Sequence, residues 1–293
     1  MGAIDRNDGH LKWDVLTSKR PGLSRDLPPG KEDLMWVSNS STLIYGEHDA
    51  VLVDTFLTID QSRTLLDWVI ASGKNLTAIY LTHGHGDHVF GVGPILEHFP
   101  RAKALATPEV VAAIRSQVSP TSLEEFWRKL FPGQIPEHLP IADPLPGNEL
   151  ELEGQKLVAV NTGRTDTAQS TCLHIPSIGL LVGGDVVYNG IHPYLAETTT
   201  TSRREWISTL DELEALNPQA VIAGHKIPEN QDDPHIIAET RQYLRDFNRL
   251  DESTTTVREL YDAVLELYPD RANPGSLWGG AKAAKQQTIS TTK

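Results

Sequence analysis

In the stretch Thr82-His83-Gly84-His85-Gly86-Asp87-His88, three imidazoles and one carboxylate lie within six residues, directly after an apolar run at 76–81. The intervening glycines let the backbone turn tightly enough for neighbouring side chains to converge. Neutral imidazoles and a carboxylate suit a borderline cation such as Zn²⁺. The stretch therefore predicts a metal site at the end of a strand, because a metal-free surface loop would not need this clustering.

Composition narrows the class of protein. The 293 residues are 39% hydrophobic and 22% charged, which is typical of a soluble globular chain. A net charge of -13 would repel a polyphosphate backbone, so we expect no nucleic-acid partner. We expect no membrane partner either, because no apolar run approaches the ~18 residues of a membrane helix and no secretory signal is visible. The single cysteine, Cys172, lies in an apolar run, which favours a buried structural role and a cytoplasmic protein.

Hydrophobic periodicity predicts strands and helices that alternate along most of the chain. Strands are predicted at 35–38, 41–45, 50–54, 77–81, 102–106, 149–152, 157–160, 171–175, 179–183 and 220–223. Helices are predicted at 59–71, 92–98, 109–118, 204–216, 236–250 and 257–267. Two mixed halves of this kind favour an α/β sandwich in which helices cover the outer faces of paired sheets.

The chain divides into three parts by composition. Residues 1–30 are rich in proline and glycine and predict a loosely ordered arm, followed by the main domain at 31–250. Within it, 119–146 holds aromatic residues and six prolines, which indicates an inserted cap that walls a pocket or, equally, a packed surface excursion. Residues 251–293 predict a C-terminal helical extension, with a polar tail that frays after Trp278.

Two further metal-binding residue types stand near glycines where predicted strands end. Gly183-Gly184-Asp185 ends one apolar strand, and Ala223-Gly224-His225 ends another. Either alone is more typical of a structural turn. Because a metal enzyme gathers ligands from several strand ends, their occurrence together with the histidine-rich stretch predicts one shared centre.

With these residues the chain resembles the metallo-beta-lactamase superfamily, in the hydrolase branch of glyoxalase II, lactonases and thioesterases, over about residues 35–250. The resemblance implies a four-layer αββα sandwich with two metal ions between the sheets. It also implies a supporting role for Asp54 beneath the metal loop and a catalytic role for Asp87. The metal ligands that it implies are His83, His85, Asp87, His88, Asp185 and His225.

One position departs from the family pattern. Where the family has Gly-His-Thr, this chain has Gly163-Arg164-Thr165. A guanidinium stays protonated and offers only donors, so it cannot bind a cation. The first metal site is therefore expected to be weakened, unless Asp166 or His192 supplies the missing ligand.

Three consequences of Arg164 stay open. The chain could hold one metal in the second site and still hydrolyse substrates, with Arg164 stabilising an oxyanion or gripping a substrate carboxylate. Its charge could instead replace a cation by pairing with Asp185. Hydrolysis could also be lost, leaving a lyase, an isomerase or a binding protein. A deleterious or engineered arginine in an ordinary hydrolase is the plainest alternative.

The leading interpretation is a metal-dependent hydrolase. Its metal-bound hydroxide, oriented by Asp87, would cleave an ester, lactone or thioester of a small anionic substrate. The alternative is a metal-poor protein that acts as a lyase or isomerase or only binds a small molecule. The expected cofactor is one or two Zn²⁺ ions, with manganese or iron as other candidates, and a homo-oligomer stays open. Substrate-binding residues are expected at Arg164, His192, Tyr194 and Lys226.

Overall fold

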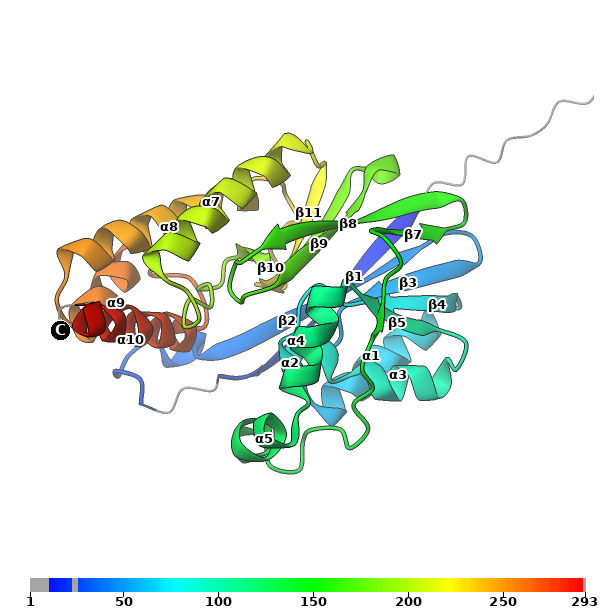
Figure 1. Cartoon of the computed structure of the whole chain (residues 1–293), viewed down its shortest axis with the longest axis horizontal. Helices are drawn as coiled ribbons and strands as arrows, with labels where there is room; N and C mark the ends of the chain where they lie inside the picture. Colours follow the sequence, from blue (N-terminus) through cyan, green and yellow to red (C-terminus); the bar gives the residue numbers. More distant parts are fainter. Residues whose placement is uncertain (1–10, 23–25, 292–293) are drawn as a thin grey trace, which may run out of the picture.

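The computed structural model describes residues 11–22 and 26–291, which form two facing β-sheets between two layers of helices (Figure 1). The first sheet has the order β1-β2-β3-β4-β5-β6 and the second has the order β11-β10-β9-β8-β7. The first contains β1 (Lys12–Pro21), β2 (Trp36–Tyr45), β3 (Asp49–Val53), β4 (Asn75–Tyr80), β5 (Lys103–Ala106) and β6 (Asp143–Pro144). The second contains β7 (Glu149–Leu152), β8 (Gln155–Gly163), β9 (Ser170–Ile175), β10 (Leu180–Asn189) and β11 (Ala220–Lys226).

Alternation along the strands explains why both faces of each sheet are covered. In β3, Leu52 packs towards the helices, whereas Val51 and Val53 face the second sheet. In β11, Ile222 joins the same inter-sheet core and Val221 packs outward against helices. Because successive side chains of a strand point to opposite faces, an apolar run is buried on both sides.

Helices between the strands cover the outer face of the first sheet. They are α1 (Ile59–Ala71), α2 (Gly86–Val89), α3 (Val92–His98) and α4 (Pro108–Gln117). The start of α1 is fixed by Thr58, whose side chain accepts a hydrogen bond from the Gln61 amide. Leu65 and Val69 lie one turn apart and bury the face of α1 that packs on the sheet.

The second sheet is covered by later helices, including the predicted extension (Figure 1). These are α7 (Thr200–Ala215), α8 (Ile236–Ser253), α9 (Val257–Leu267) and α10 (Pro274–Thr291). Capping boxes begin two of them, at Thr199 for α7 and at Thr256 for α9. Leu260 of α9 and Leu277 of α10 join Trp206 and Phe247 in one buried cluster, so the extension shares the core of the main domain.

The remaining elements are short. They are η1 (Glu32–Leu34), α5 (Pro120–Ser122), η2 (Leu123–Trp127), α6 (Arg128–Leu130) and η3 (Pro176–Ile178). Three of them form the predicted insertion, in which Trp127 and Phe131 are buried against the first helical layer. Phe126 remains 49% exposed.

The predicted αββα sandwich is confirmed, but three local predictions are corrected. Part of the expected N-terminal arm is strand β1, which pairs with β2 along its whole length from Lys12 to Pro21. The rest of the arm prediction at 1–10 and 23–25 lies outside the described residues. The strand expected to end at 183 continues as β10 to Asn189. The polar tail expected to fray after Trp278 continues as helix α10 to Thr291.

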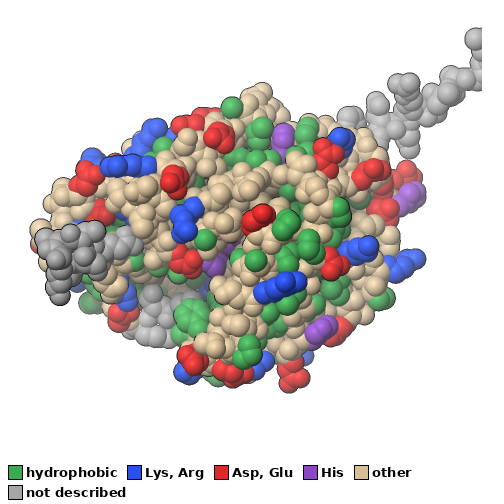
Figure 2. All heavy atoms as spheres, in the orientation of Figure 1, with side chains coloured by type: hydrophobic (Ala, Val, Ile, Leu, Met, Phe, Trp, Pro, Cys, Tyr) green, Lys and Arg blue, Asp and Glu red, His purple; other side chains and the backbone are tan. Residues whose placement is uncertain are grey.

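Two properties of the surface complete the description. No helix in the described part of the chain is long and apolar enough to cross a lipid bilayer. Acidic and basic side chains are interspersed over the face shown in Figure 2.

Candidate metal centre

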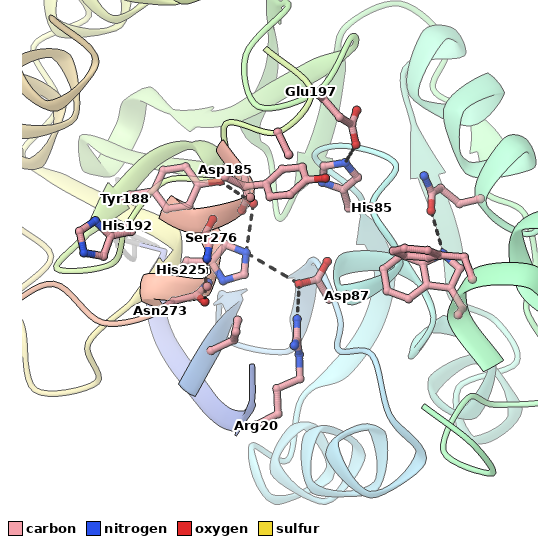
Figure 3. Close-up of a pocket in the computed structure, with 18 of the residues that line it drawn as sticks. Arg20, His85, Asp87, Asp185, Tyr188, His192, Glu197, His225, Asn273 and Ser276 are labelled. Carbon is pink, nitrogen blue, oxygen red and sulfur yellow. Dashed lines mark hydrogen bonds and ion pairs between the residues drawn. The ribbon is translucent and has the colours of Figure 1, made fainter. Parts of the chain in front are cut away.

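The two sheets bring distant loops to one point. Strands β3 and β4 are parallel, as are β10 and β11, and the histidine-rich loop follows β4. A bridge between His83 and Ser170 joins this loop to the start of β9, which brings the preceding loop at 163–169 beside it. Figure 3 shows His85, Asp87, Asp185 and His225 directed towards a common centre.

The first metal group consists of His83, His85, Asp166 and Asp185, whose ligand atoms lie within 4.8 Å of one another. The Asp166 Oδ2 atom lies 3.1 Å from His85 Nδ1 and 3.8 Å from His83 Nε2. His83 and Asp166 are at most 1% exposed. Two imidazoles and two carboxylates therefore converge in a largely buried site, which His85 and Asp185 open to the neighbouring cavity.

The second metal group consists of Asp87, His88 and His225, which meet the same 4.8 Å limit. Asp185 lies against it as well, with Oδ1 3.2 Å from His88 Nε2 and Oδ2 3.1 Å from His225 Nε2. Because Asp185 contacts both groups, it could serve as a ligand in either of them.

A β-bulge explains how Asp185 reaches this position in mid-strand. The register of β10 against β11 shifts on either side of Gly184, which has a φ of 51°. A Cβ atom at Gly184 would lie 2.5 Å from Thr82 Oγ1. A Cβ atom at Gly224 would lie 2.4 Å from Asp185 Oδ1. Glycine at position 224 thus keeps space for the carboxylate, and glycine at position 184 keeps space for Thr82.

Asp54 supports the centre from below rather than lining it. Its Oδ1 accepts a hydrogen bond from the Thr82 amide at 2.8 Å, and its Oδ2 lies 3.0 Å from His88 Nδ1. Its φ is 59°, a conformation that costs energy in a residue other than glycine. Asp54 also forms a cluster with His83 and His88, but its oxygens are already occupied by these bonds.

The converging charges shift the pKa values of the imidazoles. Burial opposes protonation, yet Asp166 and Glu197 raise the pKa of His85 well above its usual value. Asp185 likewise raises the pKa values of His88 and His225 against the effect of burial. Without bound metal ions, protonated imidazoles balance the negative charge of the buried carboxylates.

A metal ion fits this donor set. Among the described residues, the buried atoms His83 Nε2, Asp166 Oδ2 and Asp185 Oδ1 have no hydrogen-bond partner. An unsatisfied buried polar atom is costly, and three that converge on one point fit a shared cation, which would replace the protons of the neighbouring imidazoles. Neutral imidazole nitrogens and carboxylate oxygens are ligands for Zn²⁺, Mn²⁺ and Fe²⁺.

The structure corrects the expectation for Arg164. Its side chain is exposed, and Arg164 is not among the residues that line the cavity at the centre. Asp166, two positions later, is the residue of this loop that could act as a ligand, and its Oδ1 accepts a hydrogen bond from Thr165 Oγ1 at 2.9 Å. Arg164 therefore neither contacts Asp185 nor removes a ligand from the first metal group.

Sequence reasoning missed two residues that hold Asp87. Arg20 in β1 contacts Asp87 Oδ2 at 2.9 Å, and Asn39 in β2 donates to the same oxygen at 3.0 Å. Although burial opposes it, the neighbouring His88 and Arg20 hold the pKa of Asp87 well below its usual range. Arg20 was not predicted to lie at the centre because residues 1–30 were expected to form a loosely ordered arm.

The cavity beside the centre has a volume of about 480 Å³. His192 and Tyr194 line it, as predicted substrate-binding residues should, together with Phe126 and Trp127 of the insertion. Burial, with the charges of Arg271 and Lys31, lowers the pKa of His192 to about 3. The wall opposite includes Asn273, Gly275, Ser276 and Gly279, from the start of α10.

Lys226 does not line this cavity. Its side chain is 5% exposed and forms an ion pair with Asp232. Since Arg164 is also outside, the predicted pair of substrate-binding cations is absent from the described cavity wall, where Arg20 is the remaining lysine or arginine.

A sequence model of one family, described as the metallo-beta-lactamase superfamily, matches residues 34–225. The chain belongs to the metallo-beta-lactamase superfamily. The match ends at His225, so α8, α9 and α10 lie outside the part that the family model matches.

Among curated proteins of the metallo-beta-lactamase superfamily, the chain is similar to a metallo-beta-lactamase type 2 from Bacteroides fragilis. The two are 23% identical over 192 residues, which are 64% of this chain and 69% of the relative. A hydroxyacylglutathione hydrolase from Francisella tularensis subsp. holarctica is 27% identical over 116 residues, 36% of this chain and 44% of the relative. The chain thus spans less than half of that hydrolase.

Solved structures show the same fold. A metallo-beta-lactamase family protein from Thermus thermophilus gives a TM-score of 0.63 at 23% identity, covering 95% of this chain and 94% of its own. A metallo-beta-lactamase from Pontibacter korlensis gives a TM-score of 0.60 at 15% identity, covering 81% and 100%.

Proposed function

We propose that this chain is a metal-dependent hydrolase that holds two divalent cations and cleaves an ester, lactone or thioester. The observation that supports the proposal most strongly is the set of unpartnered buried atoms on His83, Asp166 and Asp185. A second support is the symmetry of the donors, since each metal group has two imidazoles and one carboxylate of its own and shares Asp185. A catalytically silent polar cluster would depend on protons from the neighbouring imidazoles alone to satisfy these atoms.

The chemistry proposed for the cations is simple. A bound divalent cation makes water acidic enough to deliver hydroxide near neutral pH and polarises a carbonyl oxygen. The carboxylate of Asp87 lines the cavity, where it could accept a hydrogen bond from a water held at the centre. Because Arg20 and Asn39 already donate to Asp87 Oδ2, this carboxylate stays ionised and orients the nucleophile.

The cavity supports a substrate with an apolar portion. Phe126, Trp127 and Val37 supply apolar wall, and a volume near 480 Å³ suits a small molecule. Arg164 and Lys226, whose positive charges were expected to attract an anionic substrate, lie outside the cavity. The proposed substrate is therefore an acyl compound recognised mainly by shape and apolar contact.

The cytoplasm is the proposed location. Its support is that Cys172 is buried and free, which fits a reducing compartment. A small-molecule substrate is the proposed partner, and a nucleic acid is not proposed because of the net charge of -13.

Metal counting and a substrate panel test the proposal together. Protein purified without chelator is expected to contain about two divalent ions per chain, and removal of the ions should abolish hydrolysis of aryl esters, lactones and thioesters. The matched variant is Asp185→Asn, which keeps the size of the bridging side chain and removes its charge. We expect it to lose metal and activity.

Two outcomes would contradict the proposal. A metal content near zero would remove the cation-dependent mechanism. Full metal content without hydrolysis of any member of the panel would remove the hydrolase and leave a metal-binding protein.

A further inference from the structure

Glu197 lies between β10 and α7 on the wall of the cavity, outside every predicted ligand set (Figure 3). Its Oε1 atom is 3.1 Å from His85 Nε2. Its Oε2 atom accepts a hydrogen bond from Thr167 Oγ1 at 2.8 Å. One carboxylate thus connects two separate loops.

The contact with His85 fixes which ring nitrogen faces the centre. His85 Nδ1 lies towards Asp166, so Nε2 points outward to Glu197. A neutral imidazole carries a single N–H group, and a carboxylate can only accept a hydrogen. With the hydrogen on Nε2, the lone pair of Nδ1 is available to a cation, as in other carboxylate-histidine-metal arrangements.

The contact with Thr167 extends the same effect to Asp166. Thr167 follows Asp166 directly, and its carbonyl oxygen accepts a hydrogen bond from the Thr165 amide at 2.9 Å. Glu197 therefore restrains the loop that carries the unusual carboxylate ligand as well as the ring of His85.

The other three imidazoles are held by groups inside the core. His88 Nδ1 meets Asp54, His225 Nδ1 meets the Ser38 carbonyl oxygen, and His83 Nδ1 meets Thr82 Oγ1. Asp54, Ser38 and Thr82 are at most 2% exposed, whereas the Glu197 side chain is 43% exposed. The restraint on His85 is thus the one supplied from the cavity wall.

We propose that Glu197 is a positioning residue that sets the cation affinity of the first metal group by orienting His85 and the Asp166 loop. This inference rests on the proposed function, because it requires that the group bind a cation. It assigns a role to a segment that also carries Tyr194, whose ring packs edge-on against His85 at 5.6 Å.

The test is a titration of metal-free protein with Co²⁺, followed by visible absorption and by calorimetry. Loss of an outer hydrogen-bond partner typically weakens metal affinity roughly 10- to 100-fold. We expect this loss at one of the two sites for Glu197→Ala and a smaller loss for Glu197→Gln, which still offers an acceptor oxygen. The second site should keep wild-type affinity.

Two further variants separate positioning from general damage. Glu205→Gln changes an exposed glutamate on α7 and should bind Co²⁺ like the wild type. Thr167→Val removes the donor to Oε2 but keeps the His85 contact, so we expect an affinity between those of the wild type and Glu197→Ala. At saturating Co²⁺ the kcat of Glu197→Gln should approach that of the wild type, since orientation is then restored by the cation.

Wild-type affinity at both sites in Glu197→Gln and Glu197→Ala would overturn the inference. Should Glu197→Ala not fold, Glu197→Gln alone decides. A wild-type protein that binds two Co²⁺ ions but hydrolyses nothing defeats the proposed hydrolase and leaves the affinity comparison intact, so the two failures are distinguishable.

Discussion

Arg164 lies on the surface, whereas Asp166, two positions later, lies in the first metal group. This difference in position predicts that substitutions of the two residues affect the metal content differently. Asp166→Asn should reduce the metal content from about two ions per chain to about one, because a ligand oxygen and its charge are lost. Arg164→His should leave the metal content unchanged, since the new ring would be exposed. Elemental analysis of both variants checks this.

Increased metal binding by Arg164→His would show that position 164 reaches the centre in solution and would contradict the assignment of Asp166. Asp166→Asn is a suitable comparison because Asn can still accept the hydrogen bond from Thr165. A loss of metal in this variant therefore reports on the ligand rather than on the loop.

The ligands were predictable from sequence where they stood in dense or glycine-flanked patterns. Residues 83–88 contain four candidates in one loop, and Asp185 and His225 each follow a glycine after an apolar run. Glu197 and Arg20 had no such signal. Their roles depend on which loops meet across the two sheets, and that depends on long-range packing that no local pattern records.

At the level of elements, the sequence patterns failed to predict β1 and predicted β10 too short. The segment Lys12–Pro21 has six charged or hydroxyl side chains in ten positions, so it shows no hydrophobic pattern typical of a strand. Its pairing with β2 depends on backbone hydrogen bonds. In β10, consecutive glycines indicated a turn, but they form a bulge. Helices with clear caps and apolar faces, such as α1 and α9, matched their predicted bounds.

A clamp between the sheets gives a prediction at this scale. Glu153, in the turn between β7 and β8, accepts hydrogen bonds from the amides of Glu47, His48 and Asp49 in the turn between β2 and β3. The Asp49 amide contributes most, and the three bonds lower the pKa of Glu153 to about 2. The carboxylate therefore stabilises the fold most strongly when it is ionised.

The pH dependence follows from this lowered pKa. Stabilisation by Glu153 is complete above the usual value of about 4.5 and is lost as the pH falls towards 2. Glu153→Gln should lower the Tm at pH 7, and the difference from wild type should shrink between pH 4.5 and pH 2. Glu151→Gln, an exposed neighbour in β7, is the control and should have little effect at either pH. A Tm difference independent of pH would contradict the clamp.

On the scale of the whole molecule, the C-terminal helices complete both the core and the cavity. The superfamily match ends at His225, yet α10 contributes Ser276 and Gly279 to the cavity wall. The extension was predictable as helical because its apolar spacing is regular. The position of these helices beside the metal groups was not predictable. It depends on how they pack on the second sheet, and no local sequence pattern records such long-range contacts.

His192 contacts this extension through its amide, which donates to the Ala272 carbonyl oxygen, and it predicts how stability depends on pH. It is fully buried, its Nδ1 lies 2.9 Å from the Tyr243 hydroxyl of α8, and its pKa is about 3. Between pH 3 and about 6.5 the unfolded chain binds a proton that the folded chain does not, so stability rises with pH in that window. From pH 5 to pH 7 this group alone should add about 2 kcal/mol to the free energy of unfolding.

The substitution His192→Gln removes that titration, so its cost relative to wild type should be about 2 kcal/mol smaller at pH 5 than at pH 7. Urea unfolding of both metal-free proteins at the two pH values measures this difference. The metal ligands titrate in both proteins, and their contribution therefore cancels in the comparison. Parallel stability curves would mean that His192 is accessible to protons in the folded protein, and hence that the C-terminal helices open readily from the second sheet.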